Sequence, residues 1–415
     1  MLSSLYKGLL LLIVFLLIIG LASCSKKAPE KAVQPPPPPN SLLALKNALT
    51  DSTKRPIIPR QVGKENKQLI TLAGMDPSGP QLVIDPALAG RVMGVSFDGD
   101  NGDNLFWVDK SILDGSYFSA KPPSWNAGGL RTWLSPEDLF FLPEDKDAKK
   151  WFVPAELDPA PYTVYAQGKG EVTLQLTTSI KSNMGKTYNL LLTRRIQLVP
   201  FYTDSVGTVL PKDLKYVGIN LFHSMQNLSD GIIGKDMPYI CLWSLLQMNP
   251  SGTMLIPLAK KADPKRAYRD YFNPLGPDRI AIENNIISVK IDGKYRSKIG
   301  VNAKAAGPGI AYLKDEGSGQ GILFVQLFTV DPKGIYVDKP WGKKSDYGDA
   351  IEMYNDDGNM GGFTEMECHS PAKKMARGES EFHELHLHIF KGPIPELHKI
   401  GSLLLSTDIS KAKYY

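Results

Sequence analysis

Residues 361–372 read GGFTEMECHSPA and place Glu365, Glu367 and His369 at every second position. In a β-strand these side chains would leave the same face of the sheet, because strand side chains alternate with a period of two. Two carboxylates and an imidazole on one face form either a solvated outer surface or the floor of a site. If the two carboxylates face a cleft, their mutual repulsion raises the pKa of one of them, which suits acid–base chemistry.

The chain around this stretch is predicted to be mainly β-structure. Short runs of Val, Ile, Leu, Phe and Thr alternate with clusters of Gly, Asn and Asp, which are typical of turns. The clearest strands lie at residues 81–90, 171–180, 188–199, 252–259, 286–291, 321–330 and 384–390, and the best helical patterns at 41–52 and 394–406. Many strands without a repeat or alternating helices predict an all-β fold, a large antiparallel sandwich.

The N-terminus has the pattern of a targeting segment. Lys7 supplies positive charge, the apolar run LLLLIVFLLII follows, and Leu21–Cys24 read LASC. The run is shorter than the ~20 residues of a spanning helix and ends at small residues, as a cleaved signal peptide does. Cys24 in this place resembles the bacterial lipoprotein signal, in which the cysteine receives lipid and begins the mature chain. An uncleaved membrane anchor is the alternative.

These features divide the chain into three parts. Residues 1–23 are predicted to be the signal peptide, and residues 24–60 a tether that starts at the lipidated cysteine and includes a short helix. Five consecutive prolines in the tether favour stiff, extended polyproline II. Residues 61–415 form the β-sandwich domain. We expect a protein of the bacterial cell envelope, lipid-anchored to a membrane and facing the periplasm or the cell surface.

Charge and cysteine content narrow the function classes. The net charge is +5, and the basic residues are spread along the chain. This distribution lacks the electrostatic footprint of a nucleic-acid-binding protein. Only Cys241 and Cys368 remain in the predicted domain. They could pair, or both could be buried thiols, and the sequence leaves both open.

Short motifs occur in a fixed order between residues 80 and 395. They comprise Gly128, Gly129, Arg131, Trp133, Pro136 and Glu137, then Trp151, Pro154 and Asp158, and later Tyr354, Asn355, Asp356, Glu365, Glu367, Ser370, Pro371, Ala372, Gly378, Glu379 and Ser380. This ordered set resembles a bacterial family of unknown function in the galactose mutarotase-like (aldose 1-epimerase-like) superfamily. The resemblance implies a galactose mutarotase-like β-supersandwich and a carbohydrate ligand.

The resemblance also implies roles for individual residues. Mutarotases use a carboxylate as base and a histidine as acid, and Glu367 matches the position of the base, with Glu365 as its neighbour. His223, in HSMQNL, resembles the acid histidine, although a hydrogen-bonded histidine near the surface is the alternative. No histidine precedes His223 in the sequence, whereas mutarotases have an earlier one. That difference favours binding, and the carboxylate strand favours catalysis.

Further residues are expected to line the site. A sugar site commonly joins an aromatic platform to charged hydrogen-bonding groups. The candidates that the motifs supply are Arg131, Trp133, Glu137, Asn355, Asp356 and His369. The alternative is that Trp133 belongs to the core and that Arg131 and Glu137 form a local ion pair.

Two segments could be mistaken for metal sites. ELHLHIF places His386 and His388 on one strand face, with Glu384 nearby, but strand alternation explains the pattern equally well. Asp98–Asp109 is rich in Asp yet lacks the glycine at position six and the final Glu of a calcium loop. We therefore expect neither a metal nor a cofactor.

The sequence as a whole supports a functional hypothesis with two alternatives. The hypothesis is an envelope lipoprotein with a mutarotase-like cleft that binds a sugar or glycan. The first alternative is an active aldose 1-epimerase-type enzyme, and the second is a structural envelope protein.

Overall fold

The structure, a computed structural model, describes residues 39–55, 69–120, 124–203, 210–342 and 347–415. The described residues, which begin at residue 39, form one compact unit. The predicted signal peptide, Cys24 and the prolines of the tether up to residue 38 lie outside the described residues. Within the described ranges, no helix combines the length and the apolar character that crossing a membrane requires.

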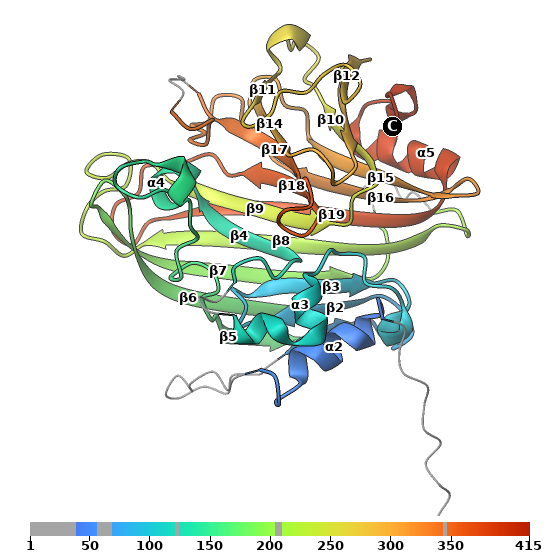
Figure 1. Ribbon diagram of the computed structural model, residues 1–415, viewed down its shortest axis with the longest axis horizontal. Helices are drawn as coiled ribbons and strands as arrows, with labels where there is room; N and C mark the ends of the chain where they lie inside the picture. Colours follow the sequence, from blue (N-terminus) through green and yellow to red (C-terminus); the bar gives the residue numbers. More distant parts are fainter. Residues whose placement is uncertain (1–38, 56–68, 121–123, 204–209, 343–346) are drawn as a thin grey trace, which may run out of the picture. The chain divides into compact units, whose positions relative to one another are not determined.

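The described strands form two antiparallel sheets (Figure 1). The first sheet has nine of these strands, in the order β1 (Ile70–Ala73), β2 (Gln81–Asp85), β3 (Arg91–Ser96), β4 (Leu130–Ser135), β9 (Cys241–Met248), β18 (Thr364–His369), β17 (Asp349–Asn355), β14 (Ser297–Asn302) and β11 (Tyr268–Asp270). The second has ten, in the order β12 (Ile280–Glu283), β13 (Ile286–Ile291), β10 (Gly252–Pro257), β15 (Gly309–Gly317), β16 (Gln320–Phe328), β19 (Ser380–Pro393), β8 (Lys215–Asn227), β7 (Thr187–Val199), β6 (Glu171–Lys181) and β5 (Thr163–Gly168). The predicted all-β fold, a large antiparallel β-supersandwich, is confirmed.

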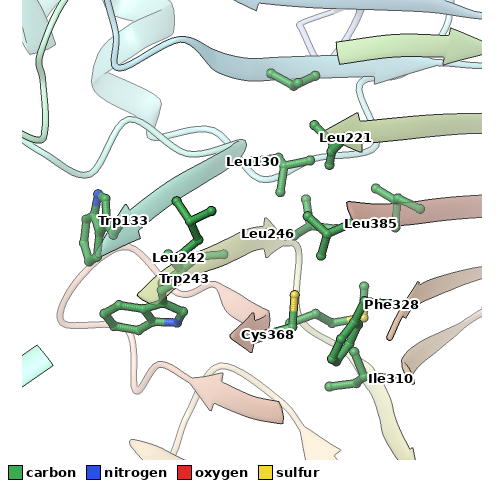
Figure 2. Close-up of a cluster of buried hydrophobic side chains, with 14 of the residues drawn as sticks. Leu130, Trp133, Leu221, Leu242, Trp243, Leu246, Ile310, Phe328, Cys368 and Leu385 are labelled. Atoms are coloured by element: carbon green, nitrogen blue, oxygen red, sulfur yellow. The ribbon is translucent and has the colours of Figure 1, made fainter. Parts of the chain in front are cut away.

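The apolar core lies between the two sheets. Leu130 and Leu246 of the first sheet belong to the same buried cluster as Leu221 and Leu385 of the second (Figure 2). In β6 and β7 buried and accessible residues alternate, as expected where one face packs on the core and the other meets solvent. In β4, β9, β17 and β18 every residue is buried, so the outer face of the first sheet is also covered.

Both predicted helices are present. α2 spans Leu42–Thr50, and the Ser41 side chain caps it by accepting a hydrogen bond from the amide of Ala44 at 3.2 Å. Its buried face packs in a cluster with Met93 of β3, so this helix belongs to the compact body although the sequence placed it in the tether. α5 spans Ile394–Leu405 and lies against β15 and β16 (Figure 1). Two short helices, α3 (Lys110–Asp114) and α4 (Glu137–Phe140), complete the described α-helices.

Cys241 and Cys368 are both free and buried. Cys368 is paired in register with Ser244 on the neighbouring strand. Cys241 therefore has the orientation of Trp243, whereas Cys368 points to the opposite face, because side chains alternate along a strand. Of the two possibilities that the sequence left open, the structure has the buried thiols.

Candidate functional site

The outer face of the first sheet gathers side chains from strands that are distant in sequence. Glu367 on β18 is in register with Leu245 on β9 and with Glu352 on β17. Leu245 is in turn in register with Arg131 on β4. Side chains in register share a face. The intervening residues, such as Met366, point inward to the core. One alternation along each strand thus separates a polar, aromatic outer face from an apolar inner one.

This outer face forms the floor of a cavity of about 600 Å³. The aromatic side chains that line it are Trp125, Trp133, Trp151, Trp243, Tyr271, Phe272, Trp341, Tyr354 and Phe363. The charged side chains that line it are Arg131, Glu137, Lys149, Arg296, Lys298, Glu365 and Glu367. Its volume lies within the range of small-molecule sites, and its wall combines rings with a few convergent polar groups.

Arg131 and Glu365 form an ion pair on the cavity wall. Arg131 Nη2 lies 2.8 Å from Glu365 Oε1, and the guanidinium carbon lies 4.2 Å from the centre of the Trp133 ring. Burial raises the pKa of Glu365 to about 7, although the charge of Arg131 lowers it. Arg131, which the motifs supplied as a candidate for the site, thus lies beside the strand that carries Glu365 and Glu367. The alternative local pair of Arg131 with Glu137 is not formed.

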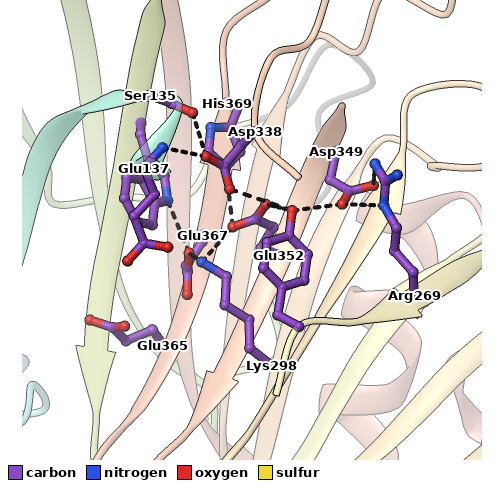
Figure 3. A network of polar contacts seen from close by, with 12 residues as sticks. Ser135, Glu137, Arg269, Lys298, Asp338, Asp349, Glu352, Glu365, Glu367 and His369 are labelled. Atoms are coloured by element: carbon purple, nitrogen blue, oxygen red, sulfur yellow. Dashed lines mark hydrogen bonds and ion pairs between the residues drawn. The ribbon is translucent and has the colours of Figure 1, made fainter. Parts of the chain in front are cut away.

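Lys298 joins two carboxylates at the base of the same wall (Figure 3). Its Nζ lies 2.7 Å from Glu352 Oε2 and 3.1 Å from Glu367 Oε2. Glu367 Oε2 also accepts a hydrogen bond from Trp243 Nε1 at 2.9 Å. Burial raises the pKa of Glu367, and the Lys298 charge opposes that effect. Burial disfavours the charged form of Lys298, but the carboxylates outweigh it and raise the pKa of Lys298 well above its usual range.

Tyr271 connects this pair to a second set of carboxyl groups. Its hydroxyl oxygen lies 2.5 Å from Glu352 Oε1 and 2.7 Å from Asp349 Oδ2. One hydroxyl has one proton to donate, so one of these carboxyl groups must be protonated to form both hydrogen bonds. Burial raises the pKa of Asp349 to about 6, although Arg269 stabilises its charged form. Tyr271 thus links the ion pairs of Lys298 to the pair of Arg269 with Asp349.

Glu137 is the third carboxyl group of the cavity wall. It is the first residue of α4, where a carboxylate suits the helix N-terminus. Its Oε1 accepts a hydrogen bond from Trp151 Nε1 at 2.9 Å, while its backbone amide donates to Asp338 Oδ1 at 2.6 Å. Burial raises the pKa of Glu137 to about 8, against the opposing charge of Lys298. At neutral pH Glu137 is thus largely protonated, next to ionised groups.

Comparison with known proteins places the chain in a family. A family model described as "Family of unknown function (DUF6786)" matches residues 60–414, nearly the whole described body. The chain belongs to this family, DUF6786. No curated protein matches the sequence.

Solved structures similar to this DUF6786 protein share little sequence with it. A protein assigned as an aldose 1-epimerase from Escherichia coli K12 is 9% identical, with 77% of this chain and 98% of that chain covered and a TM-score of 0.47. A galactose mutarotase-like protein from Lactobacillus casei is 10% identical, with coverage of 77% and 99% and a TM-score of 0.39. A galactose mutarotase related enzyme from Lactobacillus acidophilus is 9% identical, with coverage of 77% and 96% and a TM-score of 0.40.

His223 does not reach the cavity. It lies on the inner face of β8, with 2% of its surface exposed, and its Nδ1 is 3.1 Å from Thr132 Oγ1 of the first sheet. Burial lowers the pKa of His223 well below its usual value, so it is neutral. The structure therefore does not support His223 as the acid. It is a hydrogen-bonded histidine, but in the inter-sheet core rather than near the surface.

His369 lies beneath the cavity wall rather than on it. Its ring stacks on Trp243 at a centroid distance of 5.5 Å, and its Nε2 lies 3.4 Å from Glu352 Oε2. Burial disfavours its charged form, but Glu352 outweighs that effect and raises the pKa of His369. His369 thus shares a face with Glu365 and Glu367, as predicted, but contacts the carboxylate network instead of the cavity.

Asn355 and Asp356 order the loop beside the cavity and do not line it. Asn355 Nδ2 donates to the carbonyl of Tyr295 at 2.9 Å. Asp356 Oδ2 accepts from the backbone amides of Gly358, Met360 and Gly362. The structure thus does not support direct substrate contacts for either residue, because their polar atoms already bond to groups of the protein. Their role is to position the rim residues Met360 and Phe363.

Four residues of this network were not expected from the sequence: Lys298, Glu352, Tyr271 and Asp338. Lys298 sits in the run SKIGVN, whose alternation indicates a strand but not its neighbours. Only the register β14–β17–β18 brings Lys298 to Glu367. A lysine within an otherwise apolar strand was the one available signal, since Lys is rarely buried unless it is paired.

Asp338, Glu352 and His369 could in principle hold a metal ion, since one ligand atom of each lies within 4.8 Å of the others. One histidine and two carboxylates are ligand types that zinc binds in proteins. Lys298 Nζ already lies 2.7 Å from Glu352, so an ammonium supplies positive charge at this point. Asp338 Oδ1 accepts from Ser135 Oγ at 2.9 Å and from the Glu137 amide. These contacts explain the cluster as a hydrogen-bonded network.

The ion pairs of Lys298 yield a stability prediction. Lys298→Met leaves Glu352 and Glu367 without their cation, which should lower the free energy of unfolding by about 3–5 kcal/mol at pH 7. The loss should shrink toward pH 5, because protonation removes the unpaired charges and the pKa of Glu367 is already raised. Chemical denaturation at both pH values measures this, with the exposed Lys294→Met as control. A loss below about 1 kcal/mol, or one independent of pH, contradicts the assignment.

Proposed function

We propose that this protein binds a carbohydrate in the cavity on the outer face of the first sheet. The observation that carries the proposal is the pairing, in one cavity, of indole rings with ionised groups fixed by partners of their own. Arg131 is held by Glu365, and Glu367 is held by Lys298 and Trp243. The C–H faces of a sugar pack on aromatic rings, while its hydroxyls bond to oriented charged groups.

The rigidity of these groups supports binding of a hydroxyl-rich ligand. Side chains already locked by ion pairs lose little conformational freedom when a ligand arrives, so less of the interaction energy is spent on ordering them. Trp151 is fixed in the same way by its hydrogen bond to Glu137. A sugar hydroxyl can donate to Glu365 or Glu367 and accept from Arg131, which matches both kinds of group on the wall.

The cellular setting is a further part of the proposal. The pattern around Cys24 supports lipidation of that cysteine and attachment of the mature chain to a membrane of the cell envelope. Five prolines between Cys24 and the body would keep the cavity away from the lipid surface. Several acyl chains on one cysteine would give stable attachment, since each buried CH₂ contributes ~0.8 kcal/mol.

Lipidation is tested by metabolic labelling with a palmitate analogue. The wild-type chain should be labelled and should sediment with membranes, whereas Cys24→Ala should lose the label. Cys368→Ala serves as the matched control, because that cysteine is buried in the body and should leave labelling unchanged. Equal labelling of wild type and Cys24→Ala would refute the lipid anchor.

An acid–base reaction on the bound sugar is the second candidate function. The observation that favours it is that Glu137, whose pKa burial raises to about 8, shares the cavity with Glu367, which is paired with Lys298. A protonated carboxyl beside an ionised one supplies an acid and a base across one ligand. Glu137 would then take the place that the sequence analysis assigned to His223.

Glu367→Gln tests binding and catalysis together. A glycan array first identifies a ligand of the wild-type protein, and titration calorimetry then compares the variants. We expect Glu367→Gln to weaken binding at least about tenfold, because an amide pairs less strongly with a sugar hydroxyl than a carboxylate does. Stability should change by only about 1 kcal/mol, since the shape is kept and Glu352 still pairs with Lys298.

The exposed Glu384→Gln on β19 is the matched control and should bind as the wild type does. Optical rotation of a freshly dissolved pure anomer provides the second readout. Equilibration faster than in buffer, abolished by Glu137→Gln, identifies the enzyme. Unchanged ligand binding by Glu367→Gln, or no glycan bound by the wild type, would contradict the proposed site.

A further inference from the structure

Arg296 differs from Arg131 and Lys298, the two buried cations of the cavity wall, in the side chains that it contacts. It lines the cavity, half-buried, in the turn before β14. Its guanidinium carbon lies 4.0 Å from the centre of the Phe272 ring, which fixes the plane of the group. Arg131 and Lys298 each pair with carboxylates. Among the described residues, no carboxylate forms an ion pair with Arg296.

The polar atoms of the wall that lack a protein partner are mostly donors. The buried N–H groups without a partner on residues that line the cavity belong to Arg131 (Nε and Nη1), Arg296 (Nε) and Trp341 (Nε1). The other polar atom without a partner on these residues is Oε2 of Glu137, which is itself a donor when this carboxyl group is protonated. An unpaired buried donor costs ~1–3 kcal/mol. The wall therefore needs a ligand that brings more acceptors than donors.

A neutral sugar meets this requirement poorly. Each of its hydroxyls brings a donor proton together with its acceptor lone pairs. The donor protons can be taken up by Glu365 and Glu367, but the side of the cavity around Arg296 and Trp341 offers donors. A carboxylate or another anionic group is an acceptor only, and the planar fork of an arginine matches a carboxylate in two parallel hydrogen bonds.

We infer that the ligand is an acidic carbohydrate whose anionic group contacts Arg296, with its hydroxyls on Glu365 and Glu367. This inference rests on the proposed function, because it assigns the ligand class of the same cavity. Stacking on Phe272 holds Arg296 for that contact, and Trp341, whose ring centroid lies 6.0 Å from that of Phe272, brings a further N–H donor to the same part of the wall. A uronic acid and a sulfated sugar share this chemistry.

The need for an anionic group is tested directly with pairs of ligands that differ only in that charge. Titration calorimetry on the full-length chain compares an oligogalacturonide with its methyl ester, which keeps the shape and removes the charge. The ester should bind at least about tenfold more weakly, and rising salt should weaken the acid but not the ester. A sulfated oligosaccharide and its desulfated form provide the second arm. The arm with the larger difference names the anionic group.

Arg296→Gln should abolish the roughly tenfold preference for the acid over its ester. Arg195→Gln is the matched control, because Arg195 also lies 4.0 Å from a ring, that of Phe222, but on the second sheet and outside the cavity. It should leave the preference intact. Equal binding within both pairs, acid and ester as well as sulfated and desulfated ligand, overturns the inference while the proposed function stands. If neither charged nor neutral carbohydrates bind, the proposed function fails as well.

Discussion

A buried lysine is the interaction on which the outer face of the first sheet depends. Lys298 places one ammonium between Glu352 and Glu367, within a group of carboxyl groups that also includes Asp338 and Asp349. Without a cation these groups could not all remain ionised in a low-dielectric environment. Lys298 favours the charged form of Glu367 at the cavity wall and so opposes the effect of burial, which raises the pKa of Glu367. Burial is the main cause of the raised pKa values of Glu137, Glu365 and Glu367, and repulsion between the carboxylates adds to it.

The covering of that face explains why a sheet can carry such a network. The strands that bear it are buried on both sides, with the second sheet beneath and aromatic side chains around the cavity above. Trp243 contributes to both roles, because it lines the cavity, donates to Glu367 and stacks on His369. Aromatic rings thus exclude water from the ion pairs and at the same time offer flat surfaces to a ligand.

Much of the fold was predictable because its signals are local. Period-two alternation and turn residues identified the strands, and the helices at residues 42–50 and 394–405 followed from their own periodicity. The same alternation placed Glu365, Glu367 and His369 on one face.

The partners of these residues were not predictable, since Lys298 and Glu352 reach them only through strand register. The resemblance pointed to His223, but a motif does not show which face of a strand a side chain takes, and β8 turns His223 into the core. Asn355 and Asp356 belong to the ordered motifs through their backbone contacts in a loop, which a sequence motif cannot distinguish from ligand contacts.

The central claim is that the outer-face cavity holds a sugar, and a crystal structure of the complex tests it most directly. Crystals of the protein with the tightest ligand from a glycan array would show where the ring lies. Our account predicts a sugar ring against the indoles of the cavity, with a hydroxyl within hydrogen-bonding distance of Glu365 or Glu367. A sugar bound elsewhere on the body, with this cavity holding only water, would contradict it.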